Sequence, residues 1–232
     1  MKEEITLCAR LEMIAALVPQ GARLIDIGTD HAYLPAALFK RGRIASAWAA
    51  DVREGPLERA RGTLARAGLS AQIGLKRSDG LDGFSAEDGD CIVIAGMGGE
   101  TIADILSRAP WTKKGVALVL QPQSMIYELR AFLKENGYTI GIETLCRDRG
   151  RYYMAMAARG GAWTGESLFF SQMLLEHPLG RAYLQELLRR EQAALAGLQK
   201  AAAPDAARMR RQREIVRALE AFSLLTGGAR SG

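Results

Sequence analysis

The chain has little cysteine and little histidine: its 232 residues include three of the former and two of the latter. Cys8, Cys91 and Cys146 lie far apart, so they indicate neither a disulfide framework nor a cysteine metal site, and a reducing cytosol suits them best. Two histidines are too few for a histidine-rich metal centre. We therefore expect a cytoplasmic protein without a bound metal.

Long apolar runs are also missing. The N-terminus begins Met1-Lys2-Glu3-Glu4 and reaches Pro19 without one, so we expect neither a signal peptide nor a membrane span. Hydrophobic residues nevertheless make up 48% of the chain and charged residues 25%, which is enough apolar material for a folded core. The net charge of +5 modestly favours a polyanionic partner, although ordinary solubility explains it equally well.

Strand and helix patterns alternate over the first two-thirds of the chain. Short apolar runs bounded by glycine predict strands, and amphipathic stretches between most of them predict helices, with Asp30 as a cap of the second helix. The expected strands lie near residues 24–27, 46–52, 71–77, 92–94, 115–123, 138–148 and 151–159. Such alternation predicts a parallel sheet with helices on both faces, and the last two strands, joined by a short turn, should be antiparallel. We predict a doubly wound α/β domain over residues 1–160.

Residues 161–232 have a different character after the break at Gly160-Gly161. No strand pattern occurs there, and leucines recur at alternating spacings of four and three until Glu191 interrupts them. Apolar positions resume beyond Pro204-Asp205. Two long helices joined by a short turn should pair antiparallel in coiled-coil fashion. The seam positions are Leu184, Leu188, Leu195, Leu198, Met209, Val216 and Leu219.

Acidic residues and glycines follow the predicted strands. In an open α/β sheet, ligands bind at the carboxyl ends of the strands near the point where strand order reverses. Here the first four strands end, in order, at Asp26-Ile27-Gly28, at Asp51, at Asp79-Gly80 and at Gly96-Met97-Gly98-Gly99. Taken singly, Gly28 could be only a tight turn and Asp51 only a helix cap. Together they predict one binding cleft.

The first of these turns indicates which nucleotide the cleft suits. It reads Gly28-Thr29-Asp30-His31-Ala32, with Asp30 where a dinucleotide fingerprint needs a second glycine. A carboxylate repels a pyrophosphate but attracts an ammonium or sulfonium group. The loop therefore disfavours NAD and favours S-adenosylmethionine, with the ribose at Asp51, the adenine amine at Asp79 and the aminocarboxyl end at the Gly28 loop.

Five motifs then resemble those of a known family. "DIGTDHAYLP", "AADVREGPLERA", "RSDGL", "IAGMGGETI" and "LVLQPQ" look like the motifs of the bacterial tRNA adenine-N1 methyltransferases of the TrmK family. The resemblance runs from residues 9–18 through 151–156, and the trailing helices are similar to the family's architecture. It implies a Rossmann-like class I S-adenosylmethionine-dependent methyltransferase domain that modifies adenine 22, in the D-loop region of tRNA. One departure is Thr29, where many relatives carry serine, another small hydroxyl residue.

The resemblance also implies roles for individual residues. Arg10 and Tyr33 should lie at the cleft mouth, although Arg10 could instead form a surface ion pair and Tyr33 could belong to the core. Gln121 is assigned to the substrate side. The cofactor set is Asp26, Gly28, Asp30 and His31 at the methionyl end, Asp51 and Val52 at the ribose and adenine, Asp79 and Gly80 at the adenine edge, and Gly96 and Met97 beside the methyl group.

The chemistry follows from what the fourth strand lacks. Enzymes that methylate the exocyclic adenine amine usually carry an Asn/Asp-Pro-Pro-aromatic stretch there, and this chain does not. Ring N1 has an in-plane lone pair, so it needs alignment more than activation. We expect no obligate general base. If a carboxylate assists as the ring becomes cationic, Asp30 is the first candidate. Met97 and Gly98 are expected at the point of methyl transfer. The base must be turned outward, where Tyr33 or Tyr153 could stack on it.

Five arginines lie within ten residues of the second predicted helix of the C-terminal hairpin: Arg208, Arg210, Arg211, Arg213 and Arg217. They form either a solvated helix face or a surface that contacts tRNA phosphates. The expected protein is a monomer with tRNA as its partner. The alternatives are a methyltransferase that acts on another RNA or a small molecule, and a non-catalytic RNA-binding protein on the same fold.

Overall fold

The computed structural model describes residues 5–165, 167–200 and 205–227. The chain divides into two compact units, Met1–Gly165 and Glu166–Gly232, so the boundary expected between residues 160 and 161 lies slightly before this division. Within the described ranges, no helix combines the length and the apolar character that crossing a bilayer requires.

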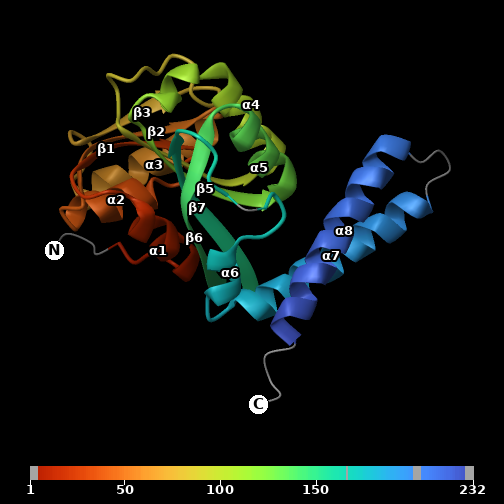
Figure 1. Ribbon diagram of the computed structural model, residues 1–232. Helices are drawn as coiled ribbons and strands as arrows, with labels where there is room; N and C mark the ends of the chain where they lie inside the picture. The colour runs from red at the N-terminus through yellow and green to blue at the C-terminus, as the bar shows by residue number, and fades with distance from the viewer. Residues whose placement is uncertain (1–4, 166, 201–204, 228–232) are drawn as a thin grey trace. The chain divides into compact units, whose positions relative to one another are not determined.

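The first unit is built on a seven-stranded sheet with the order β3-β2-β1-β4-β5-β7-β6 (Figure 1). The strands are β1 (Ala22–Ile27), β2 (Ile44–Asp51), β3 (Ile73–Arg77), β4 (Cys91–Gly98), β5 (Ala117–Ser124), β6 (Tyr138–Asp148) and β7 (Arg151–Gly160). The first five are parallel, and β7 is antiparallel to both β5 and β6. The predicted parallel sheet with an antiparallel terminal hairpin is confirmed.

Helices cover both faces of this sheet (Figure 1). On one face lie α1 (Ala9–Leu17), α2 (Tyr33–Lys40) and α3 (Glu54–Ala67). On the other face lie α4 (Gly99–Arg108) and α5 (Ile126–Glu135). The 3-10 helix η1 (Pro110–Lys113) follows α4. The connection from β3 to β4 is a loop without a helix, in which Leu81 and Phe84 are buried. The result is the doubly wound, Rossmann-like arrangement that the sequence predicts.

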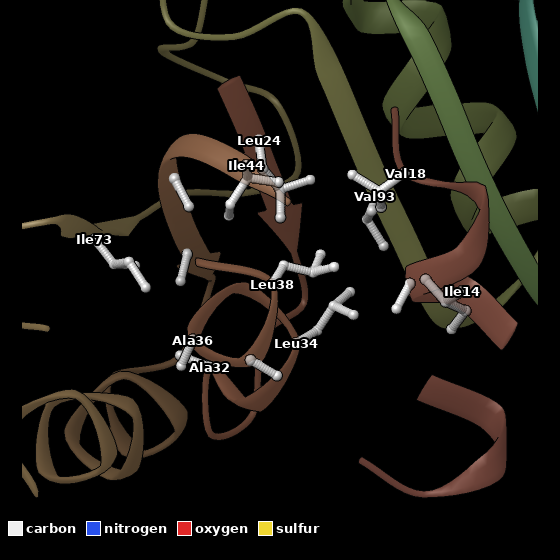
Figure 2. Packing of buried hydrophobic residues seen from close by; sticks show 14 of the residues in the cluster. Ile14, Val18, Leu24, Ala32, Leu34, Ala36, Leu38, Ile44, Ile73 and Val93 are labelled. Carbon is white, nitrogen blue, oxygen red and sulfur yellow. The ribbon is translucent and has the colours of Figure 1, made fainter. Parts of the chain in front are cut away.

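Side chains alternate between the two faces of the central strands, as the strand period requires. Val93 of β4 joins the core beneath α1 and α2, whereas its neighbours Ile92 and Ile94 point to the other face. Figure 2 shows that core, with Ile14, Val18, Leu24, Leu34, Leu38, Ile44 and Val93 packed together. Burying each such side chain contributes about 1.5–3 kcal/mol. This packing fixes α1 and α2 against the sheet.

The structure corrects two local predictions. Asp30 does not cap α2: the cap residue is Ala32, in the left-handed conformation at φ 54°, and its N–H donates to Thr29 Oγ1 at 3.2 Å. The extra left-handed turn moves Asp30 away from the helix start. The glycine segment, expected as a loop after β4, continues that strand to Gly98 with register shifts on either side of Met97.

The second unit contains α6 (Gln172–Glu176), α7 (Gly180–Gln199) and α8 (Ala206–Gly227). α7 and α8 pack antiparallel, with Gln192 of α7 hydrogen-bonded to Glu220 of α8. The interruption at Glu191 is accommodated because Gln212 Nε2 donates to its carboxylate at 2.7 Å. The two predicted helices are confirmed, and coiled-coil packing between them stays a prediction. Buried positions are Leu184, Leu187, Ile215, Val216 and Leu219.

Candidate functional site

Strand order reverses between β1 and β4, because the chain leaves β1 toward β2 and β3 and then returns to the other side of β1. Such a switch point is where open α/β sheets bind ligands. A cavity of about 200 Å³ opens there, lined by Arg10 and Leu11 of α1, by residues 26–34 and by Ala95. Six predicted site residues therefore meet at one cavity: Arg10, Asp26, Gly28, Asp30, His31 and Tyr33.

Gly28 shapes the floor of this cavity. Its φ of 77° favours glycine, and a Cβ there would lie 2.3 Å from Met97 Cε. The N–H groups of Gly28 and Thr29 both donate to the carbonyl of Ala50, at 2.8 and 3.0 Å, which ties the turn to β2. Gly28 is therefore a tight turn and a point of close approach between β1 and β4 at once.

Asp26 places a buried carboxyl group at the cavity, at the end of β1. Its residue is 8% exposed, and burial raises the pKa of this carboxyl to about 7, against the opposing effect of a hydrogen bond with Thr29. A cation bound in the cavity would favour the ionised form and lower this pKa again. Asp26 is therefore suited to an ammonium group.

Asp30 belongs to a network of charged and aromatic side chains. Arg59 Nε of α3 donates to Asp30 Oδ1 at 3.0 Å, and His31 Nε2 lies 3.5 Å from Asp30 Oδ2. The rings of His31 and Tyr33 stack with centroids 5.0 Å apart and planes 6° apart. Tyr33 is 41% exposed, so it does not belong to the core. Sequence reasoning missed Arg59, since nothing in the pattern of α3 links it to a distant loop.

Asp51 and Val52 lie at the end of β2, outside the residues that line the cavity. Asp51 is buried, and its Oδ1 accepts from the N–H of Arg53 at 2.8 Å. Arg53, and not Asp51, is the cap residue of α3. Val52 is half exposed although it is apolar, so it offers a face to a flat ring. The orientation of the Asp51 carboxylate is therefore fixed, and the accessible apolar side chain of Val52 follows it in the chain.

Asp79 is held from α4. Arg108 Nη2 lies 3.2 Å from Asp79 Oδ1, and the same guanidinium pairs with Asp82 and Asp104. Gly80 has φ 57°, and a Cβ there would lie 2.7 Å from Ile105 Cγ1. Asp79 is thus an exposed carboxylate of fixed position that does not line the cavity, and Arg108 is a second partner that sequence reasoning missed.

The three glycines at the end of β4 differ in what their positions require. Gly96 adopts φ 80°, a conformation that favours glycine. A Cβ on Gly99 would lie 2.0 Å from the carbonyl oxygen of Met125, so Gly99 permits close packing against the start of α5. Gly98 has an ordinary φ of −67°, and a Cβ there would meet Ser124 Oγ at 3.4 Å. Gly96 and Gly99 are therefore required by the fold of the chain itself, whereas Gly98 is not.

Three predicted substrate residues meet beside Gly96. Arg10 Nη1 donates to Gln121 Oε1 at 3.1 Å, and the Arg10 guanidinium lies over the Tyr153 ring at 5.8 Å from its centroid. Gln121 is fully buried, and its Nε2 donates to the carbonyl of Pro122. A Cβ on Gly96 would lie 3.6 Å from Arg10 Nη1. Arg10 is therefore a positioned cation next to Gly96 of the glycine edge, which we define as Gly96–Gly99, and it belongs to no ion pair among the residues that the structure describes.

A larger cavity, of about 720 Å³, lies at the opposite edge of the sheet, where β5 and β6 begin and β7 ends. Apolar residues and glycines line most of it, with Arg159 as its charged member. It lacks the acidic groups and the strand-end geometry of the smaller cavity. The chemistry therefore belongs to the cavity at the switch point.

A sheet of this order, with acidic strand ends and a glycine edge at its switch point, defines a Rossmann-like methyltransferase. Residues 7–156 match the methyltransferase domain family. Over 170 residues the chain is 34% identical to the tRNA (adenine(22)-N(1))-methyltransferase of Bacillus subtilis, covering 71% of each chain. The chain belongs to the tRNA (adenine(22)-N(1))-methyltransferase family, as its motifs predict.

Two solved structures show the same relationship over both units. A Streptococcus pneumoniae protein, assigned as a tRNA (m1A22) methyltransferase and crystallised with S-adenosyl-L-methionine, is 30% identical at a TM-score of 0.81, with 94% of this chain and all of that chain covered. The Bacillus subtilis m1A22 tRNA methyltransferase TrmK is 26% identical at a TM-score of 0.78, with 97% and 98% covered.

Proposed function

We propose that this protein transfers a methyl group from S-adenosylmethionine to N1 of adenine 22 in tRNA. The observation that carries the proposal is the end of β4: Ala95 lines the cavity at the switch point, and the following residues, Gly96–Gly98, include no acid or base and lie beside Gly28 and Arg10. Such an edge can position a base but offers no side chain to activate an amine. The names of the relatives and the cofactor of the Streptococcus pneumoniae structure support the same conclusion.

The residues at the strand ends fit S-adenosylmethionine. The buried carboxyl group of Asp26 and the Asp30 carboxylate suit its ammonium group, and the Gly28 turn leaves room for close approach. Asp51, held by the N–H of Arg53, suits the ribose hydroxyls, and the exposed Val52 suits one face of the adenine. Once bound, the cofactor supplies an electrophilic methyl group on a sulfonium centre.

The chain contributes position more than proton transfer. Adenine N1 carries no proton at neutral pH, so no base has to remove one when the methyl group arrives. Holding donor and acceptor in line can replace about 7–11 kcal/mol of barrier. The ring becomes cationic during transfer, so the carboxylates of Asp26 and Asp30 favour the transition state, whereas the Arg10 guanidinium does not. Arg10 is suited instead to a phosphate or carbonyl oxygen of the RNA.

The cluster of Arg10, Gln121 and Tyr153 forms the substrate side of the proposed site. A base turned out of tRNA loses stacking at a cost of a few kcal/mol, and an aromatic ring can offset about 1–3 kcal/mol of it. Tyr153, over which Arg10 lies, and the exposed Tyr33, which lines the cavity, could do so. Gln121 fixes the Arg10 guanidinium, so the polar contact is positioned before the base arrives.

Methyl transfer to bulk tRNA that lacks this modification tests the proposal directly. The full-length protein is incubated with tRNA and S-adenosylmethionine, and the nucleosides are identified by mass spectrometry. We expect 1-methyladenosine, and a tRNA transcript with guanine at position 22 should remain unmethylated. Recovery of 6-methyladenosine without 1-methyladenosine would refute the N1 assignment, and equal methylation of the guanine transcript would refute the position.

A further inference from the structure

The turn between β6 and β7 lies at the same edge of the sheet as the proposed site. β7 is antiparallel to β5 and to β6, so β6 runs parallel to β5 and ends where β1, β4 and β5 end. The last register pair of β5 with β7 is Leu120 with Met156, and β7 continues outward in register with β6 as far as Asp148 and Arg151. The outer part of this hairpin therefore extends past its last pairing with β5.

This hairpin tip, which we define as residues 147–152, carries positive charge that the fold does not neutralise. Arg147, Arg149 and Arg151 are exposed, with Asp148 as the tip's carboxylate, and none of the three arginines belongs to an ion pair of the described residues. Several other surface arginines of the first unit pair with carboxylates: Arg23 with Asp90, Arg41 with Glu12, Arg61 with Glu58, and Arg108 with three aspartates.

An aromatic side chain accompanies this charge. The Arg147 guanidinium lies 5.6 Å from the centroid of the Tyr152 ring, its partner across the hairpin. The next residue along β7 is Tyr153, whose ring lies beneath Arg10 beside the glycine edge. Because neighbouring residues of a strand point to opposite faces, Tyr152 and Tyr153 lie on different faces of the hairpin. Arg151 shares the face of Tyr153, so each face of the hairpin carries an arginine and a tyrosine.

We propose that the hairpin tip binds phosphates of the RNA strand on one side of the target adenosine. This inference rests on the proposed function, since it concerns the strand that carries the reacting base. A base turned into the cavity leaves its own backbone at the mouth, where unpaired guanidinium groups bind phosphate oxygens. Arginines combined with nearby tyrosines suit opened, single-stranded RNA, because the cations contact the backbone and the rings stack on bases without sequence preference.

The test compares variants at the two ends of β7. Arg151→Gln removes one charge at the tip, and Arg159→Gln removes one exposed charge at the other end of the same strand, about 26 Å away. We expect Arg151→Gln to raise the Kd for tRNA several-fold, and the triple variant R147Q/R149Q/R151Q to raise it by about tenfold or more. The slope of log Kd against log salt should fall by about 2 in the triple variant. Arg159→Gln should change neither quantity.

S-adenosylhomocysteine binding and thermal unfolding, measured on the same variants, keep the result interpretable. Both should be unchanged, because the tip arginines contact neither the cofactor site nor the core. Equal Kd values for the triple variant and the wild type, or equal losses for Arg151→Gln and Arg159→Gln, would overturn the tip as an RNA contact while wild-type methylation upheld the proposed function. Absence of methylation by the wild-type protein would instead remove the proposed function.

Discussion

Arg59 Nε of α3 donates to Asp30 Oδ1 at 3.0 Å and thereby joins a surface helix to the turn at the end of β1. Asp30 and Arg59 are both substantially exposed, with side-chain exposures of 63% and 48%. An ion pair this exposed contributes only about 0–1 kcal/mol to stability. The ion pair instead fixes the orientation of the Asp30 side chain, which would otherwise adopt several rotamers at the mouth of the cavity.

Arg59→Gln should weaken S-adenosylhomocysteine binding several-fold with little change in thermal stability, because Asp30 loses its fixed orientation. Calorimetric titration and a thermal melt measure the two effects. Arg61→Gln is the matched control, since Arg61 lies on the same helix and pairs with Glu58 at the surface. Equal cofactor affinities for wild type and Arg59→Gln would show that Arg59 does not position Asp30 for binding.

Asp26 predicts a pH dependence of stability. Burial raises its pKa to about 7 in the folded protein, from 3.8. The unfolded chain ionises this group more readily, so its contribution to stability is complete below about pH 4 and is lost as pH rises through about 7. The loss is at most about 4 kcal/mol. Asp26→Asn should therefore flatten the pH dependence of the urea midpoint between about pH 4 and 7, and an unchanged profile would contradict the raised pKa.

The same group predicts how cofactor affinity varies with pH. A ligand ammonium binds the ionised carboxylate better, so the wild-type Kd for S-adenosylhomocysteine should fall between pH 6 and 8. Asp26→Asn should bind more weakly at pH 8 and lose most of this dependence. Calorimetry at both pH values measures the Kd for S-adenosylhomocysteine. If the Kd of Asp26→Asn varies with pH as the wild-type Kd does, another group is responsible for the pH dependence.

Gly98 and Gly28 should respond differently to substitution. Gly98 has an ordinary φ, and a Cβ there would make only ordinary contacts, so Gly98→Val should fold and bind S-adenosylhomocysteine normally but should lose methyl transfer by blocking the base. Gly28→Ala should instead lose cofactor binding, because φ is 77° and its Cβ would meet Met97. Binding and initial rates separate the two effects. A fully active Gly98→Val would show that this edge does not contact the base.

The buried pair of Arg130 on α5 and Glu143 on β6 should matter for stability alone. Both side chains are almost fully buried, at 2% and 1% exposure, and form an ion pair. Removing one charge, as in Glu143→Leu, should cost about 3–5 kcal/mol of unfolding free energy. The double variant R130M/E143L should recover most of it, as measured by urea unfolding. A double variant as unstable as the single one would indicate that the polar contacts of the pair are needed.

Arginines of α8 predict RNA binding by the second unit. Arg210, Arg213 and Arg217 are exposed and spaced three and four residues apart, so they form one stripe on the side of α8 opposite the buried Leu219. The triple glutamine variant should bind tRNA at least several-fold more weakly, with a smaller salt slope and unchanged S-adenosylhomocysteine affinity. An unchanged tRNA affinity would favour the alternative that this stripe is only a solvated helix face. Arg189→Gln on α7 provides a control in the same unit.

Much of the fold follows from local patterns. Apolar runs ending in glycine or aspartate predicted the strands, and the carboxyl ends of parallel strands necessarily meet at one edge, which placed the site. What the patterns could not give was the order of the last strands, since a hairpin can pair with β5 through either strand, and the structure uses β7. Likewise, the left-handed turn at Ala32, which excludes Asp30 as a cap, depends on how the loop packs between β1 and α2.

The sequence by itself determined the sheet, the acidic strand ends and the glycine edge, because strand period and turn chemistry act between residues that are close in the chain. Only the tertiary structure decided the charge of the site: Asp26 is the carboxyl group that resists ionisation, Asp30 is paired with Arg59, and the hairpin-tip arginines are among those that the described surface leaves outside any ion pair. The physical reason is that pKa values and ion pairs depend on burial and on distances between residues far apart in sequence, which no local pattern specifies.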